Sequence, residues 1–369
     1  MNPFPIINYI GPDYFCDRER ETKEILSNIK NGRNTLLISP RRLGKTSLVK
    51  HVFVHLKKWN CLYIDLNNTS SVSGLLKVLT SALADASSKK RTLRDFLSSW
   101  KVSVEFDPYT GSFSAGMNWV KPSLEMKTIE ELFAYLNKEE NIVIAFDEFQ
   151  RITEYPESTT EGWLRGLAQK YPEIRFIYSG SHQRILKEMF NSHKRPFYRS
   201  ADVITLGLIE KDVYSSFINR QFKLGRKSFT TPSLVHLIYD QMEGKTAYIQ
   251  EVCNRLFESD DTKMTDEEIF RVIGSLIEKN ESHFITIKRG LTAIQFKVLW
   301  GIAKLEKLYL VTGSEMSKTS GVHNAVSIKK AIEKLLKIEV IYSDSDERGD
   351  YFTIDDIFLK LWLLKTKAM

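Results

Sequence analysis

The sequence is poor in cysteine and has no long apolar run. Its three cysteines, Cys16, Cys61 and Cys253, lie far apart without the spacing of a disulfide pair or a metal site, so we expect buried, reduced thiols. No stretch approaches the roughly 18 apolar residues that a membrane span needs, and the N-terminus lacks a secretory pattern. Repeats, low-complexity segments and nuclease, protease or transferase signatures are also missing. These absences favour a soluble, cytoplasmic globular protein.

The bulk composition is ordinary for a protein with a real core. The chain has 369 residues, of which 42% are hydrophobic and 27% are charged. This length predicts two or three domains. The net charge of +7 permits an acidic partner without requiring one.

The most informative segment is Asn34–Ser47, where an apolar strand, a tight loop and a helical pattern follow one another. Gly44-Lys45-Thr46 in this context is typical of a P-loop, whose backbone N–H groups surround phosphate oxygens at a helix N-terminus. We predict that Lys45 reaches the β- and γ-phosphates and that the Thr46 hydroxyl coordinates Mg²⁺. Ser39 replaces the usual first glycine, but it is small enough for the loop to close. The predicted phosphate-binding residues are Ser39, Pro40, Arg41, Arg42, Leu43, Gly44, Lys45, Thr46 and Ser47.

A second motif lies about a hundred residues further on, where the apolar run Asn141–Phe146 ends in Asp147 and Glu148. Such a run is typical of a parallel strand buried on both faces, and ligands bind at the carboxyl ends of these strands. We predict that Asp147 holds Mg²⁺ through its water shell and that Glu148 polarises a water against the γ-phosphate. A strand that ends in a solvated acidic turn is the alternative for this motif alone. Together the two motifs predict ATP binding, and hydrolysis as a further expectation.

Five short apolar runs, separated by helical patterns, predict a βαβ series and a parallel sheet. They are Thr35–Ser39, Cys61–Leu66, Ile142–Asp147, Arg175–Ser179 and Val203–Leu208. A helix is expected over Leu75–Trp100, followed by an inserted hairpin at about 101–120 with its turn at Asp107–Gly111. The predicted fold is therefore α/β, a P-loop NTPase sheet with a helical lid and a winged helix. The predicted domains are 1–208 (ATPase core), 209–283 (lid) and 284–369 (winged helix).

The winged-helix prediction rests on three helical patterns followed by two short strands, Glu339–Ser343 and Tyr351–Ile354. The third helix would offer a major groove the side chains of Asn324, Ser327, Lys329 and Lys330. Against this, the intervening wing, Asp344–Asp350, is strongly acidic and would be repelled by phosphates. Direct DNA binding and a protein-contact or autoinhibitory role are therefore both open.

Together these motifs resemble the archaeal-type P-loop ATPases, which are related to the AAA+ and STAND groups, over almost the full chain. The resemblance implies an ATP-dependent switch with ATP and Mg²⁺ as ligands, in which hydrolysis releases the lid and changes how the winged helix is presented. It also implies an unidentified protein partner. The rival hypotheses are a DNA-binding regulator that uses nucleotide as a sensory or structural ligand, and a scaffold whose P-loop is degenerate because of Ser39.

The resemblance assigns roles to further residues. Tyr14–Glu21 looks like the family's N-terminal signature with Asp17 in place of glycine, which implies that Phe15 and Arg18 lie near the adenine. An ordinary helix start capped by Asp17 is the alternative. The next strand of the family ends in Ser-Gly-Ser, which implies a γ-phosphate sensor role for Ser179 or Ser181. A strand-ending turn would use the same residues.

Two more segments look like parts of the family. Arg195–Ser200 implies that Arg195 or Arg199 is an arginine finger acting in its own chain or a neighbour's, so an oligomer is possible. A surface arginine is the alternative for each. Glu243–Tyr248 looks like the family's Gly-x-Pro lid motif, with Thr246 at the proline position.

Overall fold

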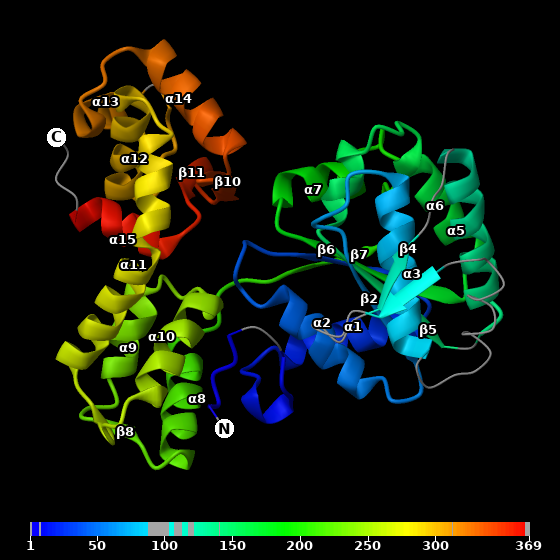
Figure 1. The fold of residues 1–369 in the computed structure, drawn as a ribbon, viewed down its shortest axis with the longest axis horizontal. Helices are drawn as coiled ribbons and strands as arrows, with labels where there is room; N and C mark the ends of the chain where they lie inside the picture. The colour runs from blue at the N-terminus through cyan, green and yellow to red at the C-terminus, as the bar shows by residue number, and fades with distance from the viewer. Residues whose placement is uncertain are drawn as a thin grey trace. The chain divides into compact units, whose positions relative to one another are not determined.

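The computed structural model describes residues 2–6, 9–87, 103–106, 113–116, 122–139, 141–311 and 313–365. The chain divides into two compact units (Figure 1). The core unit is Asn8–Gly207, and the C-terminal unit is Leu208–Met369 together with Met1–Ile7.

The core unit is built on a five-stranded sheet in the order β2-β5-β6-β1-β7, in which all neighbours are parallel. Its strands are β1 (Thr35–Ile38), β2 (Asn60–Asp65), β5 (Ile142–Asp147), β6 (Ile174–Gly180) and β7 (Asp202–Thr205). Every residue of β1 and β5 is buried, as expected for strands covered on both faces. The five strands correspond to the five apolar runs, and the predicted α/β class is confirmed. The last strand ends at Thr205, short of the predicted Leu208.

Helices cover both faces of this sheet (Figure 1). Because strand side chains alternate between faces, Leu36 and Ile38 join one apolar cluster and Leu37 joins the other. The first cluster contains residues of α3, α5, α6 and α7, and the second contains residues of α1 and α2. The elements outside the sheet are η1 (Pro12–Tyr14), α1 (Glu19–Lys30), α2 (Lys45–His55), α3 (Val72–Ser87), α5 (Pro122–Leu136), η2 (Phe149–Glu154), α6 (Thr160–Lys170) and α7 (Gln183–Asn191).

The predicted hairpin arms pair as β3 (Ser103–Phe106) and β4 (Phe113–Gly116), antiparallel, with Ser103 opposite Gly116. The predicted turn between them and the end of the helix predicted to Trp100 lie outside the described residues.

The C-terminal unit is mainly helical, and its two parts share one long helix. Helix α11 runs without a break from Asp266 to Arg289, so the boundary predicted between residues 283 and 284 lies inside it. Thr265 caps its start by accepting a hydrogen bond from the Glu268 amide, and three acidic residues follow in the first turn. The preceding elements are α8 (Lys211–Leu224), β8 (Ser228–Phe229), α9 (Leu234–Gln241), α10 (Thr246–Glu258) and β9 (Lys263–Met264).

Three helices and a β-ribbon follow α11. They are α12 (Ala293–Leu305), α13 (Ser314–Ser320), α14 (Ala325–Lys337), β10 (Ile341–Asp346) and β11 (Gly349–Ile354), and a final helix, α15 (Ile357–Lys365), completes the chain's described part. The ribbon strands are longer than predicted and include most of the acidic run. The Asp346 carboxylate has partners there, since it accepts hydrogen bonds from Lys307 Nζ at 2.8 Å and from the Tyr309 hydroxyl at 2.7 Å.

The N-terminal segment was predicted to belong to the ATPase core, but Met1–Ile7 groups with the C-terminal unit. The reason is Phe4, which is 1% exposed and packs against Phe222 and Phe257 with ring centroids 5.2 and 6.0 Å apart. Asn254 donates to the Phe4 carbonyl at 2.8 Å, and Asn2 donates to the Asn254 carbonyl at 2.9 Å. Over the described part of the chain, no helix has the length and apolar character to cross a membrane.

Candidate nucleotide-binding site

The loop between β1 and α2 has the backbone conformation of an anion-binding turn. Arg42 and Gly44 both have positive φ, 67° and 89°, and Gly44 caps the N-terminus of α2. Alternation of this kind turns successive N–H groups toward one side of the loop. At Gly44 a Cβ would meet nothing within 4 Å, so its backbone conformation, and not space, requires glycine.

Ser39 and Lys45 both bond to this loop. The fully buried Ser39 hydroxyl donates to the Pro40 carbonyl at 2.7 Å, which shows how a serine is accommodated at the glycine position. Lys45 Nζ donates to the carbonyls of Ser39 and Pro40, both at 3.3 Å. These contacts are longer than the roughly 2.7–2.9 Å typical of charge-assisted bonds.

The two motifs meet at Asp147, the last residue of β5. Thr46 Oγ1 donates to Asp147 Oδ2 at 2.8 Å, although the two residues are 101 positions apart. The Ser179 hydroxyl, from β6, donates to Oδ1 at 2.7 Å. Burial raises the pKa of Asp147, but the hydrogen bonds from Tyr63, Ser179 and Thr46 and the charge of Lys45 outweigh it and hold the pKa below its usual value. The carboxylate is therefore ionised at neutral pH.

Glu148 follows with a left-handed backbone, φ 52° and ψ 42°, which turns the chain away from the strand into η2. Its Oε2 accepts from Gln150 Nε2 at 2.5 Å, from the Ser181 hydroxyl at 2.9 Å and from the Ser181 amide at 3.3 Å. A Cβ on Gly180 would lie 2.1 Å from the Gln150 side-chain oxygen, so a larger residue there would have to displace the side chain that holds Glu148. The two serines predicted as phosphate sensors thus bond here to the two acidic residues, one to each.

The other predicted residues lie in different surroundings. Phe15 stacks on His51 at 4.2 Å between ring centroids. Arg18, which is 5% exposed, donates to the Gly207 carbonyl at 2.7 Å and pairs with Glu21 at 3.2 Å. The N-cap of α1 is Arg18, so the alternative of a helix capped by Asp17 is wrong. Asp17 has a φ of 60°, a conformation that suits the glycine of the family pattern.

The two candidate finger arginines contact groups near the end of α7 and on α6. Arg195 donates to both carboxylate oxygens of Glu161, from Nη2 at 2.6 Å and from Nε at 3.2 Å. Arg199 has a φ of 50° and lies over the Tyr198 ring at 5.2 Å from its centroid. The finger role of either residue stays a prediction.

Tyr63 and Gln150 belong to the site but were not predicted from the sequence. The Tyr63 hydroxyl donates to Asp147 Oδ2 at 2.5 Å, and Gln150 holds Glu148. Gln150 could have been suspected because it lies two residues after Glu148. Tyr63 gave no such signal, since its contact depends on how β2 pairs with β5.

Comparisons with known families and structures agree with this geometry. Residues 15–252 match the family model "ATPase domain predominantly from Archaea", and residues 282–365 match the model "Probable winged helix domain". No curated protein matches the sequence significantly.

Three solved structures share the fold at low sequence identity. A Walker-type ATPase of Pyrococcus abyssi is 17% identical, with 98% of this chain and 99% of that chain covered and a TM-score of 0.66. The ADP form of the Aeropyrum pernix ORC2 protein is 14% identical, with 99% and 98% covered and a TM-score of 0.56. The Aeropyrum pernix ORC1 protein in complex with DNA is 13% identical, with 96% and 93% covered and a TM-score of 0.54.

The first family model spans more than half of the chain and includes both motifs and the lid helices up to Val252 of α10. The family resemblance and the enzyme class predicted from the motifs are thereby confirmed. This chain belongs to the ATPase-domain family found predominantly in Archaea, and it is an ATP-binding P-loop ATPase with a C-terminal winged helix.

Proposed function

We propose that the protein is a Mg²⁺-dependent ATPase whose turnover works a conformational switch. The observation that carries the proposal is the hydrogen bond between Thr46 and Asp147, which joins the phosphate-binding loop to the carboxylate strand. A hydroxyl and a carboxylate are the hard oxygen donors that suit Mg²⁺, and the phosphates of ATP would complete the set. When bound, that ion would neutralise charge that develops on the phosphates.

The residues of the chain divide the remaining work. The ammonium of Lys45 would leave the loop carbonyls for the phosphates, and the loop amides would surround them. Glu148 would orient the attacking water, because the bonds from Gln150 and Ser181 fix its carboxylate beside Asp147. Ser179 and Ser181 would report phosphate loss by changing partners. Phe15 and Arg18 at the adenine, and Arg195 or Arg199 as a finger, are further parts of the proposal.

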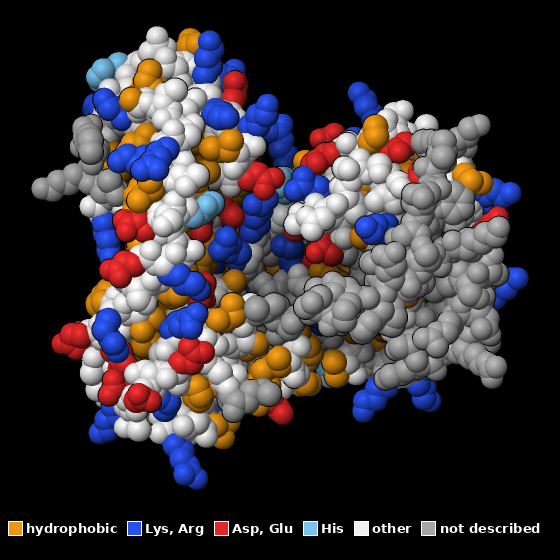
Figure 2. Space-filling view, in the orientation of Figure 1, with side chains coloured by type: hydrophobic (Ala, Val, Ile, Leu, Met, Phe, Trp, Pro, Cys, Tyr) orange, Lys and Arg blue, Asp and Glu red, His pale blue; other side chains and the backbone are white. Residues whose placement is uncertain are grey.

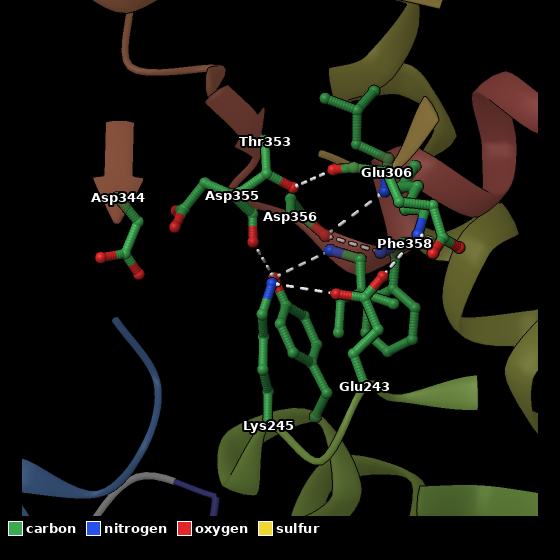
Figure 3. A network of polar contacts seen from close by, with 12 residues as sticks. Glu243, Lys245, Glu306, Asp344, Thr353, Asp355, Asp356 and Phe358 are labelled. Atoms are coloured by element: carbon green, nitrogen blue, oxygen red, sulfur yellow. Dashed lines mark hydrogen bonds and ion pairs between the residues drawn. The ribbon is translucent and has the colours of Figure 1, made fainter. Parts of the chain in front are cut away.

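The C-terminal unit supports a switch in which lid and winged helix move as one body. Figure 3 shows Glu243 and Lys245 projecting from the lid turn toward Glu306 and Asp355 of the winged helix. Lys360, on α15, donates to Glu243 at 2.6 Å and to Glu306 at 3.0 Å. We call these four side chains, Glu243, Lys245, Glu306 and Lys360, the latch network. Together with the unbroken helix α11, it would make the winged helix follow any rotation of the lid.

Tyr248 adds a second connection between the lid and the winged helix. Its hydroxyl donates to the Asp355 carbonyl at 3.2 Å and accepts from the Ile357 amide at 3.1 Å. Its ring lies 5.2 Å from that of Phe358, edge to face.

Phosphate release by the purified protein tests the catalytic part. Wild type should hydrolyse ATP with Mg²⁺ but not in EDTA, and Lys45→Ala and Glu148→Gln should lose on the order of 100-fold or more in rate. Lys57→Ala, just beyond α2, and Glu154→Gln, at the end of η2, are matched controls that should keep wild-type rates. Equal release from all five proteins would contradict the proposal.

Energy transfer between fluorophores on the core unit and on α14 tests the switch. The transfer efficiency should differ between Mg-ATP and Mg-ADP in wild type, and the difference should vanish in Lys45→Ala. An efficiency that is the same with both nucleotides would contradict the switch and leave hydrolysis standing.

A DNA-binding regulator is the second candidate function, because the similar ORC1 structure was solved in complex with DNA. Lys329 and Lys330 are exposed on α14, and Asp346 is paired with Lys307, which lessens the repulsion expected of the wing. Asn324 is committed to capping α14 through the Ser327 amide. Figure 2 shows basic and acidic side chains interspersed over the visible face of the C-terminal unit, which does not favour this candidate.

Salt-dependent binding to duplex DNA tests this second function. Lys329→Glu and Lys330→Glu should each weaken binding and reduce its salt dependence by about one phosphate contact. Binding unaffected by both changes would contradict the groove contact. A protein partner, an oligomer and a cytoplasmic location remain predictions from the sequence.

A further inference from the structure

We propose that Tyr63 is a positioning residue for the magnesium-binding carboxylate, Asp147. This inference rests on the proposed Mg²⁺-dependent function and extends it to a residue outside both motifs. Tyr63 lies on β2, next to β5, and its hydroxyl is 2.5 Å from Asp147 Oδ2 and 3.4 Å from Thr46 Oγ1. Hydroxyl groups from β2 and α2 thus converge on one oxygen of a β5 carboxylate.

The hydrogen bonds to Asp147 are distributed evenly over its two oxygens. Oδ1 accepts from the Ser179 hydroxyl at 2.7 Å and from the Glu148 amide at 3.0 Å. Oδ2 accepts from Thr46 at 2.8 Å and from Tyr63 at 2.5 Å. With donors on both oxygens, the carboxylate plane cannot rotate without breaking several bonds.

The strand pairing explains how Tyr63 reaches this position. In the parallel register of β2 and β5, Tyr63 is opposite Ala145 and Asp65 is opposite Asp147. Leu62 and Ile64 point into the apolar cluster of α3 and α5, so Tyr63 points to the other face, toward α2. Its long side chain spans the two residues to the end of β5. Its ring packs against the α1 and α2 cluster, and its hydroxyl reaches Asp147.

The two donors on Oδ2 have different tasks. A hydroxyl that donates its proton keeps lone pairs, so Thr46 can bond to Asp147 and offer its oxygen to a cation at the same time. Tyr63 holds the same carboxylate oxygen from the other strand without adding a charge. Removal of the Tyr63 hydroxyl leaves Thr46 as the one remaining hydrogen-bond donor to Oδ2 among those described. The carboxylate can then rotate more freely, and the orientations that do not face the cation lower its affinity. Partners of this kind typically change metal affinity by about 10- to 100-fold.

The test is Tyr63→Phe, which keeps the ring and removes only the hydroxyl. Tyr155→Phe is the matched control, because the hydroxyl of Tyr155 also donates a 2.5 Å bond within the core unit, to the Thr69 hydroxyl. Four quantities are measured for each protein: binding of a fluorescent, non-hydrolysable ATP analogue in EDTA, the free Mg²⁺ concentration that gives half-maximal binding, the rate of hydrolysis at saturating Mg²⁺, and the midpoint of thermal unfolding in EDTA.

In Tyr63→Phe the half-saturating Mg²⁺ concentration should rise about tenfold. Binding in EDTA, hydrolysis at saturating Mg²⁺ and the unfolding midpoint should stay near the wild-type values, and Tyr155→Phe should show no Mg²⁺ shift. Mn²⁺ titration followed by electron paramagnetic resonance should show the same displacement without any turnover.

Three results would overturn the inference. They are an unchanged Mg²⁺ dependence, a rate loss that saturating Mg²⁺ does not restore, and a lowered unfolding midpoint that Tyr155→Phe lacks. A lowered unfolding midpoint would mean that the Tyr63 hydroxyl stabilises the fold and does not position the carboxylate for the cation. If wild type itself shows no Mg²⁺ dependence, the proposed function fails, and this outcome is distinct from the other three.

Discussion

The two units each hold a carboxylate that stays ionised, but they hold it by different means. In the core unit, Asp147 is 5% exposed and bonds to the hydroxyls of Thr46, Tyr63 and Ser179. In the C-terminal unit, half-buried Glu243 bonds to the ammonium of Lys360 and lies 3.4 Å from that of Lys245. Burial raises the pKa of Glu243, but the charges of Lys245 and Lys360 and their hydrogen bonds outweigh it and leave the pKa below its usual value.

The difference between the two sites is the charge that remains. Hydroxyl donors stabilise a carboxylate without cancelling its charge, so Asp147 still attracts a cation. Lys45 adds its charge from nearby, and its ammonium donates to the carbonyls of Ser39 and Pro40. Ammonium donors cancel the charge of Glu243. Lys360 also connects α15 to the turn before α10 and to the end of α12, which suits a structural contact. The comparison indicates that the charge of the donors, more than burial, decides whether a carboxylate can bind a cation, as we propose for Asp147, or serves in a structural ion pair, as Glu243 does.

Asp147→Asn should have the largest effect, because it removes the charge that the cation needs. The amide oxygen can still accept the two hydrogen bonds on one side, whereas the amide nitrogen can only donate to the hydroxyls on the other. We expect Mg²⁺-dependent hydrolysis to fall on the order of 100-fold or more. The free energy of unfolding in EDTA should stay level or rise, because no buried charge then has to be accommodated. Phosphate release and thermal unfolding measure both, with Asp202→Asn, an exposed strand residue, as the control. A large loss of stability would mean that Asp147 is structural and would break the comparison.

Lys360→Met should have an intermediate effect, on stability. Met fills similar space but leaves Glu243 without its closest partner, at a cost of about 1–3 kcal/mol in the free energy of unfolding. The partial exposure of Glu243 and Glu306, 35% and 72%, keeps this below the cost for a fully buried pair. Hydrogen exchange of the α15 amides should accelerate, and that of β1 and β5 should not.

The exposed Lys329 of α14 provides the matched control, since Lys329→Met should leave exchange unchanged. Combining Lys360→Met with Glu243→Gln should cost less than the sum of the single changes. Additive costs would show that the two side chains do not act as a pair.

The fold and the centre of the site could be predicted because their signals are local. Each buried strand is a contiguous apolar run, and the residues of Gly44-Lys45-Thr46 and of Asp147-Glu148 are adjacent in the sequence. In a parallel sheet the carboxyl ends of the strands lie at one edge, so the end of β5 and the start of α2 are expected on the same side, and the order β5-β6-β1 then brings Asp147 to Thr46. Positive φ values at Asp17, Arg42 and Gly44 mark tight turns in the structure. The sequence indicates such a turn only at Gly44, because Arg and Asp rarely adopt this conformation.

The rest depends on contacts between distant residues that have no pattern of their own. Tyr63 reads as an ordinary strand aromatic until the register with β5 is known. Phe4 is one apolar residue in a short segment, and only its pocket between Phe222 and Phe257 assigns it to the C-terminal unit. The latch network joins Glu243, in the turn between α9 and α10, to Lys360 on α15 and to Glu306, which follows α12. The acidic wing is predicted to be repelled by phosphates, and the sequence gives no sign of its partners because Lys307 and Tyr309 lie far from Asp346 along the chain.

Changes in the wing should have the smallest effect. Its carboxylate, Asp346, accepts from one ammonium, that of Lys307, and from one hydroxyl, that of Tyr309, so it combines the donors of Glu243 and Asp147. The hydrogen bonds from Lys307 and Tyr309 lower the pKa of Asp346 to about 2. Because the folded pKa is depressed, any stability from this pair is complete above the ordinary pKa of about 3.9 and is lost only as the pH falls through about 2.

Carboxyl NMR titration should therefore show that Asp346 is ionised at every pH above its ordinary pKa. In Lys307→Met its pKa should move up toward the ordinary value, whereas in Tyr309→Phe it should move less, because the ammonium contributes its charge as well as a proton. The reverse order would mean that a neutral hydroxyl outweighs an ion pair on an exposed strand, and the distinction between Asp147 and Glu243 could not then rest on donor charge.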